Sequence, residues 1–202
     1  MVKISIRESM AGLHRRCSRL HQVRLVRPSM IYREPYMSFY EDWIRSKEDI
    51  VPWVVEHDPG DFQGMLDFLY RDDSEEKRTA PNFVPHSTYW LLNGDDQLVG
   101  AVNIRHRLNR KLLESGGHIG YGVSPSHRRK GYASAMLGLA LQITKEMGMD
   151  TVLLVCDRDN IGSERTIRKH GGLFESEFTE DSGNGVKRFW ISLTGGCRDE
   201  SR

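Results

Sequence analysis

The chain has 202 residues, a formal net charge of +1 and an isoelectric point near 7.8. Its length suits a single domain with a full hydrophobic core, and its near-neutral charge gives no broad basic surface of the kind that binds nucleic acid. The three cysteines are odd in number and lack metal-ligand spacing, which argues against a disulfide framework and a metal site and favours a reducing, cytoplasmic location. No apolar run approaches the roughly 18 residues of a membrane span, so we expect no membrane partner.

The two ends of the chain differ in composition from the middle. Residues 1–21 are rich in Arg and Ser and lack hydrophobic periodicity, which is typical of a loose leader, with an organellar targeting segment as the alternative. Residues 194–202 also lack apolar periodicity and are expected to form a flexible tail. We therefore predict one domain over residues 22–193.

Two helices are expected early in this domain, after a short strand over residues 22–28. The first helix covers residues 36–47 and carries aromatic side chains at helical spacing. Two of these, Tyr40 and Trp43, either join the core or form one wall of a substrate pocket. The second helix begins at Asp61, whose side chain is suited to cap it.

Charge is unevenly distributed around these helices. Residues 1–33 have a net charge of +7, residues 34–76 a net charge of −10, and the remainder a net charge of +4. Because an acidic surface beside a catalytic core raises the encounter rate with cations, the acidic block predicts a cationic partner. The alternative is that these carboxylates belong to solvated helix faces without a partner.

Alternating and apolar runs predict the strands of the sheet. After the first strand, six more are expected, over residues 87–92, 98–104, 117–123, 151–155, 173–178 and 186–193. The first two of these form a hairpin around a four-residue turn, and the last two should pair antiparallel. The pattern predicts an α+β fold with a mixed, mostly antiparallel sheet of six to seven strands flanked by helices.

Two basic residues follow the hairpin. Arg105 and His106 come directly after its second strand, and three roles stay open for them. They line the acceptor side of a site, fix a carboxylate of the substrate, or stand on the surface.

A basic, glycine-bearing loop joins the strand over 117–123 to a helix that ends near Gly148. A strand that feeds a helix through such a turn directs free backbone N–H groups and the positive helix end at one point, which suits a diphosphate. Gly131 lets the main chain approach the anion closely, and Ala133 is small enough to keep the helix start clear. Three consecutive basic residues, 128–130, add positive charge.

The spacing Arg-x-x-Gly-x-Ala after Val-x-Pro in this loop resembles the acyl-CoA pyrophosphate loop of the GNAT superfamily of N-acetyltransferases. A second motif is similar to that family's Asn-x-x-Ala/Ser…Lys-x-Gly signature and is carried here by Asn160, Ser163, Lys169 and Gly171. The resemblance covers roughly residues 22–193. It implies a fold whose fourth and fifth strands splay apart and admit the pantetheine arm of acetyl-CoA between them.

The resemblance also implies which residues hold acetyl-CoA, with no metal involved. The main chain of Val123 and Ser124 would hold the pantetheine amides, and Asn160 would hold the same arm. The pyrophosphate would be bound by the loop and the helix start, that is by Arg128, Arg129, Lys130, Gly131, Tyr132, Ala133 and Ser134.

The family's reaction is a direct attack of an amine on the thioester, which needs a base for the ammonium proton. Where many members carry Glu on the fourth strand, this chain has His118, whose ordinary pKa of about 6.5 suits proton transfer. Since side chains alternate along a strand, Gly120 and Gly122 share its face and are expected to leave open space for a substrate. The alternative is a histidine that is satisfied inside the sheet.

The reaction also needs a proton donor for the departing thiolate. Where many family members carry Tyr as general acid in the last helix, this chain has Ile167. Either Tyr121 or Tyr132 then substitutes, or water protonates the thiolate. An acyl-enzyme intermediate at Cys156 is a further alternative.

The resemblance implies an N-acetyltransferase that moves an acetyl group from acetyl-CoA to a primary amine of a small molecule or peptide in a ternary complex. The departure at Ile167 motivates a rival from another class, an acyl-CoA sensor or scaffold without efficient turnover. The oligomeric state stays open, a homodimer included.

Overall fold

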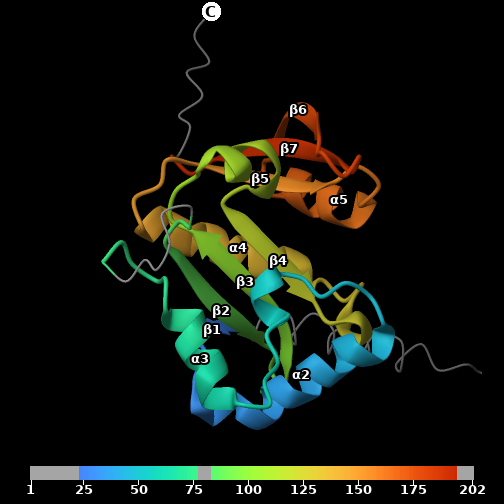
Figure 1. The fold of residues 1–202 in the computed structure, drawn as a ribbon. Helices are drawn as coiled ribbons and strands as arrows, with labels where there is room; N and C mark the ends of the chain where they lie inside the picture. The colour runs from blue at the N-terminus through green and yellow to red at the C-terminus, as the bar shows by residue number, and fades with distance from the viewer. Residues whose placement is uncertain (1–22, 77–82, 195–202) are drawn as a thin grey trace, which may run out of the picture.

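The computed structural model describes residues 23–76 and 83–194 of the chain (Figure 1). The expected leader over 1–21 and all but the first residue of the expected tail over 194–202 lie outside the described residues, so the domain boundaries remain predictions. In chain order the strands and longer helices are β1 (Arg24–Val26), α2 (Arg33–Ser46), α3 (Phe62–Tyr70), β2 (His86–Leu92), β3 (Leu98–Arg105), β4 (Ile119–Val123), α4 (Tyr132–Glu146), β5 (Thr151–Asp157), α5 (Ile161–Lys169), β6 (Leu173–Thr179) and β7 (Gly185–Ser192). Short helical turns cover Met30–Tyr32, Trp53–Val55, Leu112–Gly116 and Pro125–His127.

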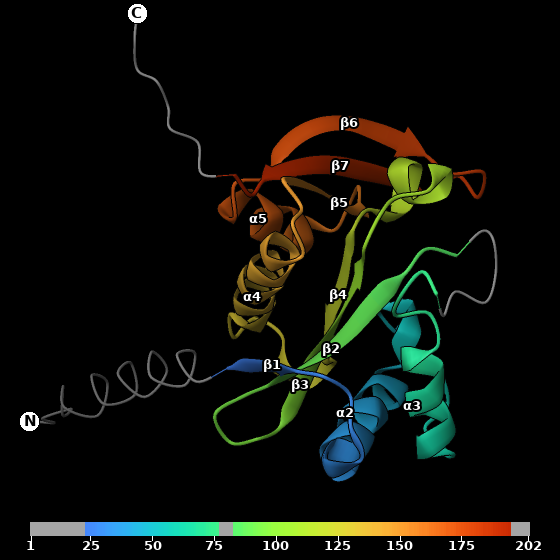
Figure 2. The same cartoon turned by 90° about the vertical axis from the view of Figure 1, so that its left-hand side faces the viewer.

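Within the described residues, seven strands form two sheets that stand beside each other (Figure 1, Figure 2). β1, β2, β3 and β4 pair antiparallel in that order, and β7 pairs antiparallel with both β5 and β6. β4 and β5 run in the same direction, because His118 contacts Leu153 and, three residues further along each strand, Tyr121 lies near Cys156. The predicted mixed, mostly antiparallel α+β fold with two splayed central strands is confirmed.

The first sheet carries an apolar layer on each of its faces. Side chains alternate along β3, so that Val102 and Ile104 join the cluster around α4 while Ala101 joins the cluster around α2 and α3. Figure 2 shows α4 on one side of β2, β3 and β4, and α2 with α3 on the other. β4 therefore also has one face toward α4 and one toward the α2 and α3 side.

Glycine and capping residues set the helix ends where the sequence predicted them. α4 starts after Gly131 and is followed by Gly148, and both have a left-handed backbone, with φ of +89° and +81°, which glycine adopts without a steric penalty. Asp61 accepts a hydrogen bond from the N–H of Gly64 over 3.0 Å and so caps α3 as expected. Over the described ranges, none of the helices has both the length and the apolar character needed to cross a membrane.

Candidate active site

β4 and β5 touch at one end and part at the other. The N–H of His118 donates to the carbonyl of Leu153 over 2.7 Å, and the N–H of Leu153 donates to Nδ1 of His118 over 2.8 Å. Beyond this contact, no backbone hydrogen bond among the described residues joins the two strands. The His118–Leu153 contact is therefore the narrow end of a cleft.

A cavity of about 1060 Å³ opens where the two strands separate. Its walls are residues 121–123 of β4, the loop and first turn of α4, the first turns of α5, and residues 47–51 after α2. The N-terminal ends of α4 and α5 thus both border the cavity, and each contributes the partial positive charge of a helix N-terminus. This arrangement favours a ligand that carries negative charge.

The start of α4 offers a row of unpaired N–H groups to the cavity. The first main-chain bond of the helix runs from the N–H of Ala135 to the carbonyl of Gly131 over 3.1 Å. The N–H groups of residues 129–134 donate to no other part of the described chain. Arg129 has a left-handed backbone with φ of +60°, as does Gly131, and such residues turn successive N–H groups toward a common point. The loop is therefore shaped to bind an anion through its main chain.

The Arg128 side chain, by contrast, is held by the protein itself. Its Nη1 donates to Glu48 over 2.5 Å and its Nε donates to the carbonyl of Val123 over 3.2 Å. The guanidinium lies over the ring of Trp43, 5.1 Å from its centroid. Nζ of Lys130 is likewise bonded to a main-chain carbonyl of the loop, over 2.8 Å. The backbone therefore supplies most of the free donors of the cradle.

The other predicted cofactor residues lie at two edges of the cavity. Asn160 caps α5 by accepting the N–H of Ser163 over 3.0 Å, and its amide nitrogen donates to none of the described residues. Val123 lines the cavity at the end of β4. Ser124 is buried, its N–H donates to a carbonyl of β3, and its hydroxyl bonds Nδ1 of His127 over 2.9 Å. Its carbonyl accepts the N–H of His127 over 2.9 Å, so the N–H, hydroxyl and carbonyl of Ser124 all have partners within the protein.

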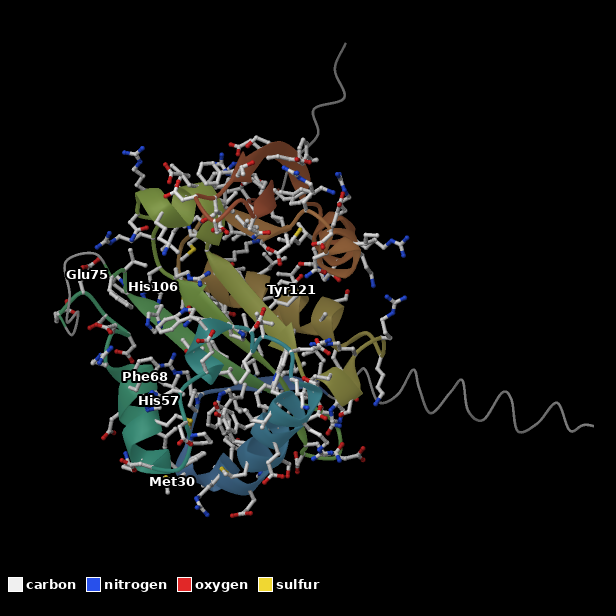
Figure 3. The ribbon with its side chains drawn as sticks, turned by 45° about the vertical axis from the view of Figure 1, so that its right-hand side comes forward. Met30, His57, Phe68, Glu75, His106 and Tyr121 are labelled. Carbon is white, nitrogen blue, oxygen red and sulfur yellow. The ribbon has the colours of Figure 1, made fainter. Side chains whose placement is uncertain are left out.

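Tyr121 projects from β4 into the cavity and reaches α5 on the other side. Figure 3 shows it beside β4, between the two sheets. Its hydroxyl lies 3.2 Å from Oγ of Ser163, and burial raises the pKa of Tyr121 to about 12. Because the hydroxyl stays protonated at neutral pH, it can donate a hydrogen bond to a ligand in the cleft. Ser163 thus helps to position the Tyr121 hydroxyl. The Asn160–Gly171 motif does not predict this contact, because it depends on a residue of another strand.

Three other residues were considered for protonating the thiolate or for forming an acyl-enzyme. Ile167 is fully buried in the core and cannot replace the family's tyrosine. Tyr132 is the first residue of α4 and lies, largely buried, at the anion-binding end of the cavity beside the ring of His127. Burial raises the pKa of Cys156 to about 11, which keeps this thiol protonated and weakly nucleophilic.

His118 is held within the sheet. Because Nδ1 accepts the N–H of Leu153, the neutral ring carries its proton on Nε2. Burial, with a smaller effect from the charge of Arg105, lowers the pKa of His118 to about 4. A proton can reach Nδ1 only if the bond to Leu153 opens. This geometry favours the histidine that is satisfied inside the sheet, and the base role remains a prediction.

The glycines of β4 do not leave the open space that the sequence suggested. A methyl group on Gly122 would collide with the carbonyl oxygen of Val51, and one on Gly120 would lie 3.2 Å from Nη1 of Arg105. The expectation was wrong because main chain and side chain from elsewhere in the protein already cover this face. Glycine is needed at position 122 for the close approach of the Val51 main chain, whereas at position 120 only the flexible end of Arg105 would have to shift.

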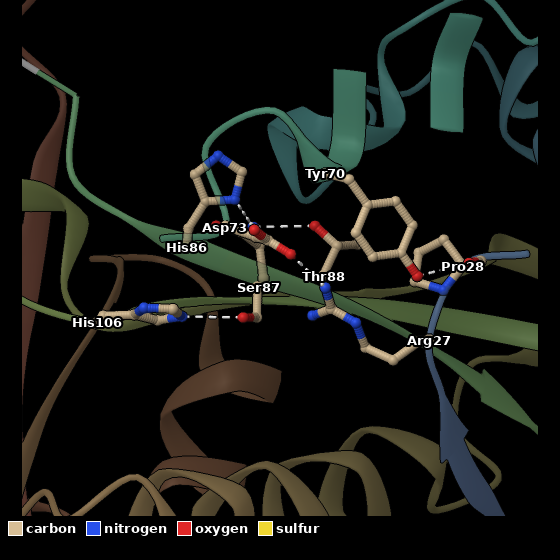
Figure 4. A network of polar contacts seen from close by, with 9 residues as sticks. Arg27, Pro28, Tyr70, Asp73, His86, Ser87, Thr88 and His106 are labelled. Carbon is tan, nitrogen blue, oxygen red and sulfur yellow. Dashed lines mark hydrogen bonds and ion pairs between the residues drawn. The ribbon is translucent and has the colours of Figure 1, made fainter. Parts of the chain in front are cut away.

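The structure separates the two basic residues that follow the hairpin. Arg105 lies over β4 on the α2 and α3 side, whereas Nε2 of His106 bonds the hydroxyl of Ser87 over 2.9 Å. Figure 4 shows Ser87 directed toward His106, and His86 and Thr88 on the opposite face of the strand, toward α3. The two residues therefore cannot serve one binding site on the same face.

The two aromatic residues predicted for the substrate pocket also differ in position. Trp43 is buried and lines the cavity beside the anion-binding loop, whereas Tyr40 is partly exposed on α2 and stacks on Tyr36 with ring centroids 6.5 Å apart. Glu48 and Val51 line the cavity as well. No local pattern marks these two residues, because their position depends on the path of the chain after α2.

Solved structures share this fold at low sequence identity, and that likeness shows the fold alone. A mutant form of the spermidine/spermine N-acetyltransferase SpeG from Vibrio cholerae has a TM-score of 0.60 and 16% identity, over 86% of this chain and 95% of that chain. The microcin C7 self immunity acetyltransferase MccE, in complex with acetyl-CoA and AMP, has a TM-score of 0.62 and 17% identity, over 85% and 92%. RimJ from Mycobacterium smegmatis, in complex with CoA-disulfide, has a TM-score of 0.61 and 17% identity, over 84% and 81%.

No curated protein matches the chain. The model of the acetyltransferase (GNAT) family matches residues 63–172, which is more than half of the chain and includes both the anion-binding loop and the start of α5. The chain therefore belongs to the acetyltransferase (GNAT) family and is an acyltransferase.

Proposed function

We propose that the protein moves an acetyl group from acetyl-CoA to a primary amine by direct attack in a ternary complex. The observation that carries this proposal is the cavity between β4 and β5, onto which residues 129–134 direct unpaired N–H groups. A helix N-terminus of this kind stabilises a diphosphate. With the diphosphate at α4, the arm of acetyl-CoA extends along β4 and the thioester lies deeper in the cleft, toward Tyr121.

Each residue of the cleft then has one task. The main chain of Val123 and the amide nitrogen of Asn160 hold the pantetheine arm. The hydroxyl of Tyr121 donates a hydrogen bond to the departing thiolate, and this stabilises the charge that develops on sulfur. The amine attacks as the free base after the proton of its ammonium form has passed to water. As the C–S bond breaks, the nitrogen loses a second proton to solvent and the thiolate takes up a proton from solvent, so that CoA leaves as the free thiol. His118 serves to hold β4 against β5.

In this proposal the acceptor needs no positive charge other than that of its own ammonium group. Several carboxylates of the acidic block over residues 34–76 are already engaged: Asp61 caps α3, Asp42 accepts a backbone N–H over 3.0 Å, and Glu48 pairs with Arg128. Their attraction for a further cation is reduced. We therefore expect the KM of a small-molecule or peptidic amine to depend only weakly on salt.

A sensor or scaffold that binds acyl-CoA without turnover is the second candidate, because Ile167 is buried where the family often has its tyrosine. The test measures acetyl-CoA binding by calorimetry and thiol release with a panel of primary amines. Acetyl transfer predicts release above the hydrolysis background with at least one amine. Tight binding of acetyl-CoA with no release for any amine would support the sensor.

A further inference from the structure

A largely buried cation without an anionic partner lies across β4 from the cavity. Arg105 ends β3, and within the described part of the chain no carboxylate pairs with it. Two other arginines of this region do pair with acids, Arg27 with Asp73 over 3.2 Å and Arg107 with Glu75 over 2.7 Å. Burial lowers the pKa of Arg105 to about 10, as expected of an uncompensated charge. Such a charge is costly to bury unless an anion comes to meet it.

The guanidinium of Arg105 is also oriented in advance. Its Nη1 donates to the carbonyls of Gly116 and Gly117 over 3.0 and 3.4 Å, at the end of the helical turn that precedes β4. Its Nε and Nη2 donate to none of the described residues. This Nε and Nη2 edge is one that binds a carboxylate through two parallel hydrogen bonds. The protein thus anchors one side of the guanidinium and leaves the bidentate side without a partner among the described residues.

The position of this edge matches the place where an acceptor would meet the thioester. The N–H of Arg105 donates to the carbonyl of His118 over 2.8 Å, and the guanidinium then lies over Gly120. The next residue of β4 is Tyr121, which points to the other face and lines the cavity. Because Arg105 itself covers β4 at Gly120, an amine that reaches this part of the strand from the α3 side meets the guanidinium there.

A second polar group on the same face also lacks a full set of partners. Asn103 pairs with Gly120 across β3 and β4 and is completely buried. Its Nδ2 bonds Nδ1 of His86 over 2.9 Å and Oγ1 of Thr88 over 3.1 Å, while its Oδ1 has no partner among the described residues. A buried acceptor without a partner is unfavourable. The face of the sheet around Gly120 thus holds a cation without an anionic partner and a hydrogen-bond acceptor without a donor.

We propose that the acceptor is an amine that also carries a carboxylate, and that Arg105 binds this carboxylate through Nε and Nη2. The substrate class is then amino acids, or peptides whose free carboxylate lies near the reacting amine. This inference rests on the proposed acetyl transfer for its substrate. Its binding step, however, can be measured without turnover.

The test measures binding of reaction products to the full-length protein in the presence of saturating CoA. A panel of N-acetyl amino acids is compared by calorimetry with the matching N-acetyl amino acid amides, which lack the carboxylate. We expect the preferred acid to bind about 10- to 100-fold more tightly than its amide, because a charged, bidentate hydrogen-bonded pair is lost in the amide. Arg105→Gln should abolish this difference, and Arg105→Lys should retain only part of it.

Arg107→Gln is the matched control, because it removes a guanidinium two residues away whose partner, Glu75, is on the surface. This variant should keep the full preference for acids. Equal binding of acids and amides throughout the panel, including no measurable binding of either, overturns the proposal. So does an acid preference that survives in Arg105→Gln. Failure of the proposed acetyl transfer would give a different result. No amine would then release thiol, while the preference for acids in product binding would persist.

Discussion

Arg128 and Glu48 are 80 positions apart in the sequence, yet their side chains meet over 2.5 Å at the rim of the cavity. The ion pair ties the anion-binding loop to the segment after α2. It also places a carboxylate beside the site that we assign to a diphosphate. The two partners are 39% and 48% exposed, so the pair contributes little to stability.

Replacing Glu48 by Gln should therefore tighten acetyl-CoA binding. The change removes a negative charge from the cavity wall and releases the guanidinium of Arg128, and we expect the Kd to fall about two- to fivefold at low salt. Calorimetry at two salt concentrations measures this, and the gain should shrink at high salt. Glu41→Gln, an exposed change on α2 away from the cavity, is the control. Weaker binding in Glu48→Gln would mean that the loop needs the ion pair to hold its shape.

Gly131→Asp should abolish acetyl-CoA binding. The residue has φ of +89° at the start of α4, and an aspartate there adds both strain and a negative charge next to the unpaired N–H groups. Gly183→Asp is the matched control, because Gly183 has φ of +87° and open space around it in an exposed turn. Calorimetry on both folded variants separates strain from charge at the site. Unchanged affinity in Gly131→Asp would place the diphosphate elsewhere.

Tyr121→Phe should lower kcat by about 10²-fold with little effect on acetyl-CoA binding, because only the donor to the thiolate is lost. Since the pKa of Tyr121 is raised to about 12, its hydroxyl does not ionise at neutral or mildly alkaline pH. We therefore expect no alkaline fall in wild-type kcat from this group up to about pH 10. Tyr132→Phe is the comparison. If it, and not Tyr121→Phe, lost kcat, the assignment of the donor would move to the start of α4.

The stability of the protein should fall as the pH is lowered from about 6.5 to about 4. The pKa of His118 is about 4 in the folded protein, and so is that of His86, whereas an unfolded histidine titrates at about 6.5. Between these values the unfolded chain takes up protons that the folded protein resists, so the free energy of unfolding decreases. Urea unfolding as a function of pH should show a smaller decrease in His118→Asn, whose amide oxygen can still accept the N–H of Leu153.

The same variant decides the catalytic role of His118. Asparagine keeps a hydrogen-bond acceptor but cannot take a proton at neutral pH, so a structural role predicts kcat/KM within a few-fold of wild type. A general base predicts instead a loss of about 10²- to 10⁴-fold. That loss, in a variant that binds acetyl-CoA normally, would return the base role to His118 and require its bond to Leu153 to open during the reaction.

Gly122→Ala should destabilise the protein by about 1–3 kcal/mol, because the new methyl group meets the main chain of Val51, which cannot rotate away. Gly120→Ala is the matched comparison in the same strand. There the methyl group meets the guanidinium end of Arg105, a flexible side chain that can shift slightly. Thermal unfolding of both variants should show the larger loss at Gly122. Equal losses would indicate that the segment after α2 moves freely over β4.

Features that depend on local chemistry could be predicted from the sequence. Gly131 and Gly148 bound α4 because glycine tolerates the left-handed backbone at both ends, and Asp61 caps α3 because its side chain is three residues from a free N–H. The anion-binding loop is also local, since one continuous segment supplies all of its N–H groups. For these reasons the fold class could be predicted from the sequence, and the assignment of a diphosphate to this loop stays a prediction.

Features that depend on contacts between distant segments could not be predicted. The carbonyl of Val51 fills the space beside Gly122 only because the chain after α2 crosses β4 there. The hydrogen bond that the N–H of Leu153 donates to Nδ1 of His118 likewise depends on how β4 and β5 meet. Periodicity shows which face of a strand a side chain occupies, but not what covers that face. The expected open substrate path along β4 was wrong for this reason.

The parting of β4 and β5 leaves two strand edges unpaired inside the molecule. On an outer surface such edges act as templates on which other chains add strands, and many β proteins cover or charge them to prevent aggregation. Here the first turns of α4 and α5 and the segment after α2 flank the opening, so another protein's strand has no straight approach. A slender, amide-bearing molecule does have one. The fold thus offers a ligand two open hydrogen-bonding edges without exposing them as a route to self-association.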